Sequence, residues 1–269
     1  MAQGRDAEGV GEATGGTVLV NLGAAGTSVT AGIAALRFTG DRLLEVRLEV
    51  AGLTPDTRYP AYIHLGTCAG GGPAAHPLRD LVSDPDGTAR ATTVVPEVSV
   101  IPPRGWFIQV YAGAAFGDGT ATPVVCGDVA LPDPVFAPAA TLVTGPVAVT
   151  LAMQDGSAAN GTATLSFPRP GVLSATLALN SLAPNTVHPA HVHFGTCAGG
   201  GPIGHYLRDV VADAHGMAVS TTEVHGVHVI PPLGWSIHVH AGPTMAGAGA
   251  TPIACGDVGP GAPVIPPVP

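Results

Sequence analysis

Short runs in which apolar and polar residues alternate recur along the 269-residue chain. Clear examples are 43–50 (LLEVRLEV) and 172–179 (VLSATLAL). A period of two places one face of a strand on a core and the other face in water. Because 38 glycines and 27 prolines supply turn residues between these runs, the pattern predicts an all-β chain with many turns.

In the first half of the chain we expect about eight short strands. The least marked lies near 78–83, and the others lie near 18–24, 32–38, 43–51, 60–66, 89–95, 106–112 and 123–129. Turns are indicated by clusters such as 84–87 (DPDG). A Greek-key β-sandwich or flattened barrel is the fold that such strands favour.

The chain is an internal duplication. Residues 18–130 and 147–259 align without a gap at a constant offset of 129, so that Trp106 falls on Trp235. Each copy has the size of one small domain, so we expect two tandem domains that could pack as an intramolecular pseudo-dimer. The predicted organisation is a flexible N-terminal segment (1–16), a first domain (17–130), a Pro-rich linker (131–146), a second domain (147–259) and a Pro-rich tail (260–269).

Charge narrows the classes of partner. The formal net charge is -9, which argues against nucleic acid and anionic membranes as partners. No stretch approaches the ~20 apolar residues that span a bilayer, so no membrane span is expected. The N-terminal segment also has no apolar signal core, as in a processed precursor.

Two cysteines lie at equivalent positions in each copy. We expect disulfides between Cys68 and Cys126 and between Cys197 and Cys255, which imply an oxidising compartment that is extracellular, periplasmic or at the cell surface. A zinc site is the competing interpretation, but the chain contains no C-x-x-C pair.

Nine of the eleven histidines lie in the second copy. Packing should need the same residues in both copies, so histidines present in one copy only are candidates for chemistry. Their counterparts in the first copy are other residues: Tyr59 for His188, Tyr62 for His191, Asp86 for His215, Pro96 for His225, Ser99 for His228, Gln109 for His238 and Tyr111 for His240.

Two H-x-H pairs, His191 with His193 and His238 with His240, occur in apolar, strand-like runs of the second copy. Side chains at i and i+2 of a strand share one face, so neighbouring strands would bring four imidazoles together. A sulfur-free imidazole site suits copper or zinc. His225 and His228 could form a separate site at the rim, and His215 is expected in a solvated turn.

The order of these features resembles the copper-zinc superoxide dismutase family and its copper-only and CHRD-like relatives, over essentially the whole of each copy. The resemblance rests on the run 188–195 (HPAHVHFG), then Cys197, the later run 235–240 (WSIHVH) and the run 254–256 (ACG). It implies two Greek-key β-sandwich domains, each with a disulfide between its two cysteines. It also implies copper ligands at His191, His193 and His240, and a structural role for His188.

The chain departs from the family pattern at three places. The residue after Pro202 is Ile203 where the family has a bridging histidine, and the nearest histidine is His205. The remaining zinc ligands have no counterpart, so the resemblance favours copper without zinc. The position of the family's superoxide-guiding arginine is Pro252, and the charged loop before it is short.

Two functions remain open for the second domain, and both require copper. In the first, copper held by His191, His193, His240 and either His238 or His205 dismutates superoxide. In the second, the same ligands sequester or deliver copper with little turnover. A structural or adhesive β-repeat protein without metal is the third alternative, and the first domain, which keeps only His64 and His76, is expected to be a degenerate scaffold.

Overall fold

The computed structural model describes residues 16–26, 29–113 and 121–267. The segment expected to be flexible, 1–16, lies outside these residues except for Gly16. The described residues form strands, turns and one short 3₁₀ turn, η1 (Gly247–Ala250), and they contain no α-helix. The all-β prediction is therefore confirmed, and no helix within the described ranges is long and apolar enough to cross a membrane.

Equivalent strands build the two copies. The first copy and the segment after it contain β1 (Val18–Ala24), β2 (Ala31–Gly40), β3 (Leu43–Ala51), β4 (Arg58–Leu65), β5 (Ala74–Val82), β6 (Ala89–Pro96), β7 (Val100–Ile101), β8 (Trp106–Ala112), β9 (Thr122–Asp128) and β10 (Val135–Phe136). The second copy contains β11 (Val147–Met153), β12 (Asn160–Arg169), β13 (Val172–Asn180), β14 (Val187–His188), β15 (Ala190–Phe194), β16 (Ile203–Tyr206), β17 (Val210–Val211), β18 (Ala218–His225), β19 (Trp235–His240) and β20 (Pro252–Val258).

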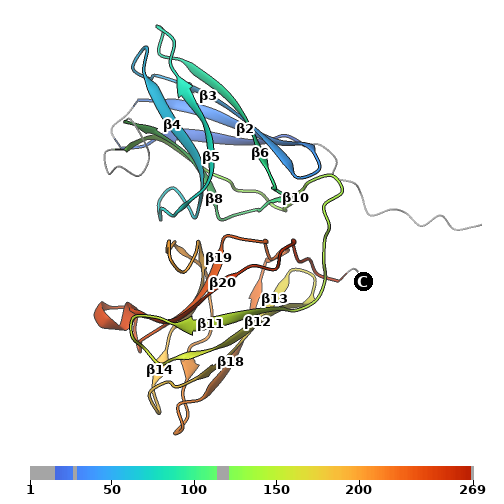
Figure 1. The fold of residues 1–269 in the computed structure, drawn as a ribbon, viewed down its shortest axis with the longest axis vertical. Helices are drawn as coiled ribbons and strands as arrows, with labels where there is room; N and C mark the ends of the chain where they lie inside the picture. The colour runs from blue at the N-terminus through green and yellow to red at the C-terminus, as the bar shows by residue number, and fades with distance from the viewer. Residues whose placement is uncertain (1–15, 27–28, 114–120, 268–269) are drawn as a thin grey trace, which may run out of the picture.

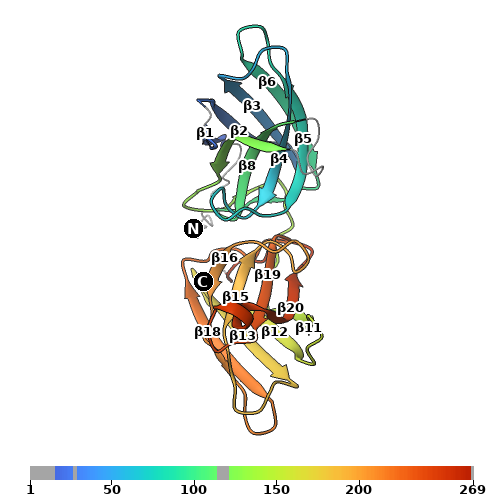
Figure 2. The same cartoon turned by 90° about the vertical axis from the view of Figure 1, so that its left-hand side faces the viewer.

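Each domain is an eight-stranded antiparallel sheet folded into a sandwich that is nearly a barrel (Figures 1 and 2). The strand order is β5-β4-β8-β9-β1-β2-β3-β6 in the first domain and β16-β15-β19-β20-β11-β12-β13-β18 in the second. β1 joins the two layers, because residues 18–22 pair with β2 while residues 23–24 pair with β9. The predicted fold, two tandem β-sandwich domains, is present.

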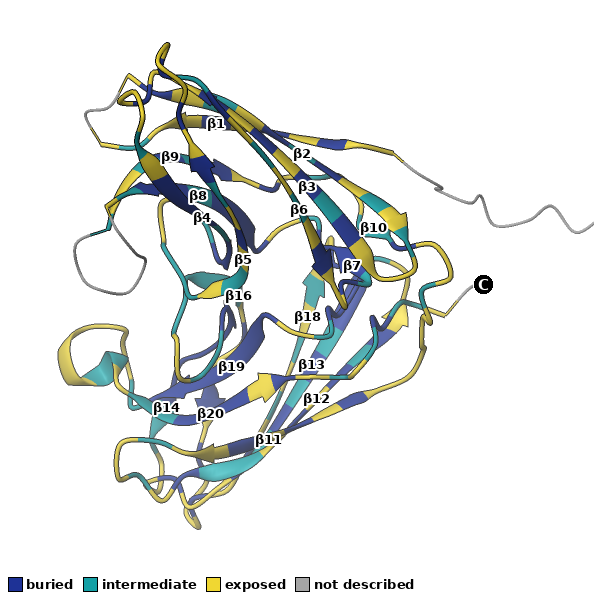
Figure 3. Ribbon diagram, turned by 45° about the horizontal axis from the view of Figure 1, so that its top comes forward, coloured by how far each residue is buried: buried dark blue, intermediate teal, exposed yellow. Residues whose placement is uncertain are grey.

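Along the strands, buried residues alternate with more exposed ones, as the alternation of apolar and polar residues predicts (Figure 3). Along β3, Leu44, Val46, Leu48 and Val50 are buried while their neighbours face outward. Each domain has its own apolar core of this kind. The least marked of the expected strands, near 78–83, belongs to the nine-residue strand β5.

Both predicted disulfides are confirmed, Cys68–Cys126 and Cys197–Cys255. Each joins cysteines 58 positions apart. In the chain-entropy account, closing a loop of this length stabilises a domain by about 4 kcal/mol. Two disulfides are typical of proteins that mature in a non-reducing environment.

The Pro-rich segments contact the domains. In the segment expected as a linker, β10 pairs with β7 of the first domain. In the tail, Val264 is 2 % exposed and forms backbone bridges with Ile230 and Val143. Part of the tail is therefore hydrogen-bonded to the second domain.

The two domains meet through contacts related by a pseudo-twofold axis. A Cβ atom placed on Gly70 would lie 2.7 Å from Pro202, and one on the equivalent Gly199 would lie 2.9 Å from Pro73. Gly105 approaches Phe194 in the same way as Gly234 approaches Leu65. Such reciprocal contacts define an isologous interface, the arrangement of an intramolecular pseudo-dimer.

Candidate metal centre

The histidine pairs lie on two neighbouring antiparallel strands. β15 carries His191 and His193, β19 carries His238 and His240, and His191 lies directly opposite His238. The alternate residues Val192, Ile237 and Val239 are fully buried in the apolar core. Because successive side chains of a strand point to opposite faces, the imidazoles lie on the other face of the sheet, as the pattern predicts.

Three of these imidazoles form one compact group. His191, His193 and His240 each offer a ring nitrogen, and these atoms all lie within 4.8 Å of one another. The three side chains are buried, with exposed fractions of 4 %, 9 % and 3 %. A group of buried histidines of this kind could hold a metal ion.

Backbone carbonyls orient two of the rings. His193 donates a hydrogen bond from Nδ1 to the carbonyl oxygen of Gly201 at 2.9 Å, and His240 donates one from Nδ1 to that of Ala250 at 2.8 Å. Carbonyl oxygens only accept, so each Nδ1 carries the proton and each Nε2 carries a lone pair. These two Nε2 atoms and Nδ1 of His191 are buried and have no hydrogen-bond partner among the described residues.

A tight glycine loop supplies one of these carbonyls. Gly201 has a positive φ of 146°, and a Cβ atom there would lie 1.9 Å from the carbonyl oxygen of Phe194. No other residue fits that approach. Asp257 holds the loop by accepting a hydrogen bond from the backbone of Cys197 at 2.7 Å. The loop is thus tied to β20, the strand that pairs with β19.

Burial keeps the histidines neutral. Burial, followed by the nearby His240 and His193, lowers the pKa of His191 from 6.5 to about 4, while Asp209 acts weakly in the opposite direction. Burial also lowers the pKa values of His193 and His240 below their ordinary range. All three rings are therefore unprotonated at pH 7, the state in which imidazole binds a metal.

His238 lies beside this group and not within it. Its ring stacks on that of His193 with centroids 4.2 Å apart, and its Nε2 is hydrogen-bonded to the hydroxyl of Ser236 at 3.0 Å. A ring nitrogen of His238 also lies within 4.8 Å of the sulfurs of Cys197 and Cys255. Since these sulfurs are joined in a disulfide, they are not available as thiolate ligands.

His205, the other expected ligand, points away from the group. It pairs with Val192 in the β15–β16 register, so it lies on the face of Val192, opposite that of His191 and His193. Its ring contacts the edges of Phe194 and Trp235, with centroids 5.7 Å and 5.3 Å away. Strand alternation therefore excludes His205 from the three-histidine group.

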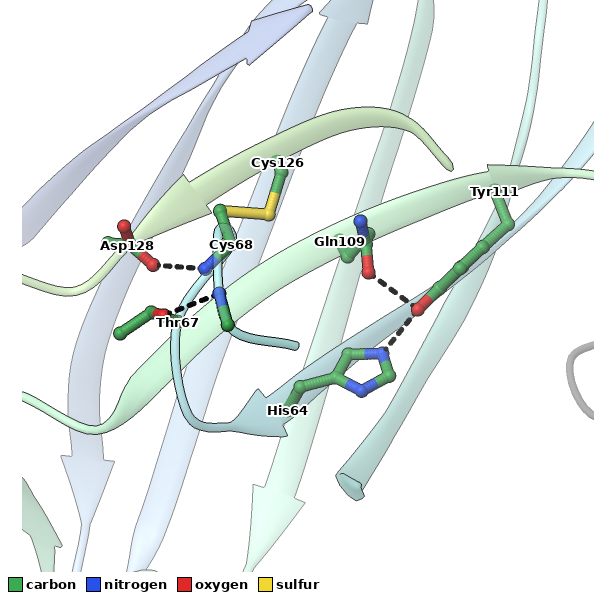
Figure 4. The surroundings of a disulfide bond; sticks show 8 residues. His64, Thr67, Cys68, Gln109, Tyr111, Cys126 and Asp128 are labelled. Atoms are coloured by element: carbon green, nitrogen blue, oxygen red, sulfur yellow. Dashed lines mark hydrogen bonds between the residues drawn. A yellow bond between two sulfur atoms is a disulfide. The ribbon is translucent and has the colours of Figure 1, made fainter. Parts of the chain in front are cut away.

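The first domain shows how the same positions look without a metal site (Figure 4). His64 corresponds to His193 and forms the equivalent hydrogen bond from Nδ1 to the carbonyl oxygen of Gly72, at 3.1 Å. Its Nε2, however, is hydrogen-bonded to the hydroxyl of Tyr111, the counterpart of His240, at 2.9 Å. The Tyr111 hydroxyl also bonds Gln109 at 2.6 Å. The nitrogen left without a partner in the second domain is satisfied here by a tyrosine.

The sequence did not indicate the carbonyl groups that orient the rings. Every residue has a carbonyl, so Gly201 and Ala250 carry no signal of residue type. The one sequence signal for these carbonyl groups is that the glycine pair 71–72 is repeated at 200–201. In both copies the carbonyl oxygen of the second glycine accepts a hydrogen bond from a histidine. No protein-family model matches the chain, and no curated protein matches it either.

Proposed function

We propose that the second domain binds one copper ion through Nδ1 of His191 and Nε2 of His193 and His240. The observation that carries this proposal is the convergence of three buried ring nitrogens without partners. An unsatisfied buried polar atom costs about 1–3 kcal/mol, so three at one point would be a large cost without a ligand. A metal ion would satisfy all three.

Copper is favoured by the chemistry of the donors. The group contains neither thiolate nor carboxylate, and imidazole nitrogen suits copper, zinc, iron and nickel. Among divalent ions of the first transition row, copper binds such a site most tightly. The resemblance to copper-only relatives of superoxide dismutase supports the same choice.

The reaction we propose is dismutation of superoxide, in which two superoxide ions and two protons become dioxygen and hydrogen peroxide. Bound copper would supply the two oxidation states that the reaction requires. The protein's own contribution is to hold three neutral imidazoles in place. Gly201 and Ala250 fix the proton on Nδ1 of two rings, which leaves the lone pair of each Nε2 available to bind the ion.

Copper sequestration or delivery with little turnover is the second candidate. It is favoured by the charges near the site, because Asp209 acts on His191 and Pro252 stands where the family has its superoxide-guiding arginine. A carboxylate near the site would repel an anionic substrate and lower its rate of encounter. Both candidates share the ligands, and in both the protein would work outside the reducing cytosol.

The two functions are separated by measuring copper content and superoxide dismutation on the same sample. We expect one copper per chain, lost in His193→Gln and in His240→Gln. His205→Gln is the matched control, since His205 lies on the opposite face, and it should keep its copper. Fast turnover by the loaded protein supports the dismutase, whereas full loading without turnover supports sequestration. No copper in the wild-type protein would contradict both.

A further inference from the structure

A cavity of about 330 Å³ lies between the two domains, away from the three-histidine group. Its wall from the second domain includes His205, His225, His228 and Trp235, and its wall from the first domain includes Arg104 and Pro103. His225 and His228, the expected rim pair, thus belong to this cavity. No Asp or Glu lines it, although the chain has 19 acidic residues against 10 basic ones.

The pseudo-twofold axis produces a second, equivalent pocket with a different character. That pocket is lined by the counterparts His76, Ser99, Trp106 and Leu233, and it measures only about 30 Å³. The duplication therefore provides an internal comparison, in which the same interface has been opened on one side and closed on the other.

Among the positions that line both pockets, three carry different residues, and two of these differences favour an anion in the larger pocket. Arg104 stands where the small pocket has Leu233, His228 stands where it has Ser99, and Gly226 stands where it has Glu97. The first change adds a cation, the second replaces a hydroxyl by a larger imidazole, and the third removes a carboxylate. The removal of the Glu97 side chain also enlarges the space.

The Arg104 guanidinium has no carboxylate partner within the described ranges. It faces the cavity near His205, and after burial its charge is the next cause that lowers the pKa of His205 to about 4. The neutral ring of His205 can donate one N–H at pH 7. Arg104 and His205 are thus a cation and a donor directed at one space.

From this comparison we infer that the cavity binds a small organic carboxylate with a flat apolar body. The guanidinium of Arg104 matches a carboxylate in geometry and charge. The rings of Phe194 and Trp235 and the adjacent prolines form an apolar wall for the rest of the ligand. None of the three convergent histidines of the metal centre lines this site. We expect the site to select its ligand by charge and shape.

Benzoate and its neutral isostere benzamide are suitable probes, followed by calorimetry and by the NMR signals of the two indole N–H groups. Trp235 lines the large cavity and Trp106 the small one, so the indole signals report which pocket is occupied. We expect saturable binding of benzoate that shifts the signal of Trp235 and not that of Trp106. Benzamide should bind at least about ten-fold more weakly.

The variants copy residues that the equivalent pocket already contains. Arg104→Leu and His228→Ser should each weaken benzoate binding, the first by at least about ten-fold. Arg90→Leu removes the same charge from β6, outside the cavity, and should leave binding unchanged. The inference would be overturned if benzoate showed no saturable binding or if benzamide bound with equal affinity. It would also be overturned if benzoate shifted the signal of Trp106 alone or if Arg104→Leu left the affinity unchanged.

Discussion

The ring of His188 donates a hydrogen bond from Nδ1 to the backbone carbonyl oxygen of His240 at 2.9 Å. His188 is buried, and its Nε2 is hydrogen-bonded to Thr186 at 2.6 Å. This relationship ties β14 to the last residue of β19 and so holds the backbone that carries one of the three convergent imidazoles. The structural role expected for His188 is consistent with this hydrogen bond, which positions the backbone of His240.

Replacing His188 by tyrosine, its counterpart in the first domain, should weaken copper binding by about ten-fold, because the His240 backbone loses its donor. Competition with a chelator measures this change. Tyr59→His is the matched control in the first domain and should leave the affinity unaltered. Equal affinity in His188→Tyr and the wild type would contradict a positioning role for His188.

The first domain can be used to rebuild the site. His64 already has the carbonyl partner and orientation of His193, and tyrosines occupy the other two positions. We expect the double variant Tyr62→His/Tyr111→His to bind a second copper, raising the metal content from one to two per chain. The variant Tyr62→Phe/Tyr111→Phe removes the same hydroxyls without adding ligands and should bind no extra copper. If both variants bind equal amounts, three histidines at these positions are not sufficient for a site.

Loss of the Cys197–Cys255 disulfide should destabilise the second domain by about 4 kcal/mol, because the unfolded chain gains the freedom of a 58-residue separation. Urea unfolding of Cys197→Ser/Cys255→Ser measures the change. The equivalent variant of Cys68 and Cys126 should destabilise the first domain by a similar amount, since the separation is the same. A free energy of unfolding that is unchanged in either variant would contradict this account.

Acid should destabilise the metal-free protein at a higher pH than carboxylates alone would cause. Burial lowers the pKa values of His191, His205 and His238 from 6.5 to about 4, so each binds a proton more readily when the chain is unfolded. Stability is therefore full above about pH 6.5 and falls as the pH decreases toward 4.

Thermal melting between pH 7.5 and about 4 follows this loss. The variant His238→Gln should show a smaller decrease, because glutamine does not titrate, whereas His215→Gln, on the exposed turn, should behave as the wild type. A melting temperature that stays constant over this range would show that the buried histidines do not control acid stability.

The sequence predicted the strands well because the apolar alternation and the duplication mark them twice. β3 and β8 fall at the expected positions. Only the later part of β5 was expected, because the apolar residues of this strand do not alternate strictly and so give a weak signal. The disulfides followed from equivalent cysteines. What could not be predicted is the register of an edge strand, which decides that His205 faces Trp235 and not His191.

The interdomain cavity was also beyond sequence reasoning. His225 and His228 were recognisable as a pair, but their partner Arg104 lies more than a hundred positions earlier in the chain, in the other domain. Only the packing of the two domains brings these residues together. The pairing of the tail with the second domain could not be predicted either. The bridge between Val264 and Ile230 depends on backbone contacts, which have no periodic pattern in the sequence.

The number of nitrogen ligands on copper is the most direct test of the central claim. Electron paramagnetic resonance of the protein loaded with one equivalent of Cu(II) measures it through nitrogen hyperfine splitting. We predict coupling to three imidazole nitrogens in the wild type and in the controls His205→Gln and His215→Gln, and loss of this bound-copper spectrum in His240→Gln. A spectrum that is unaltered in His240→Gln but changes in either control would show that copper binds elsewhere and would contradict the site described here.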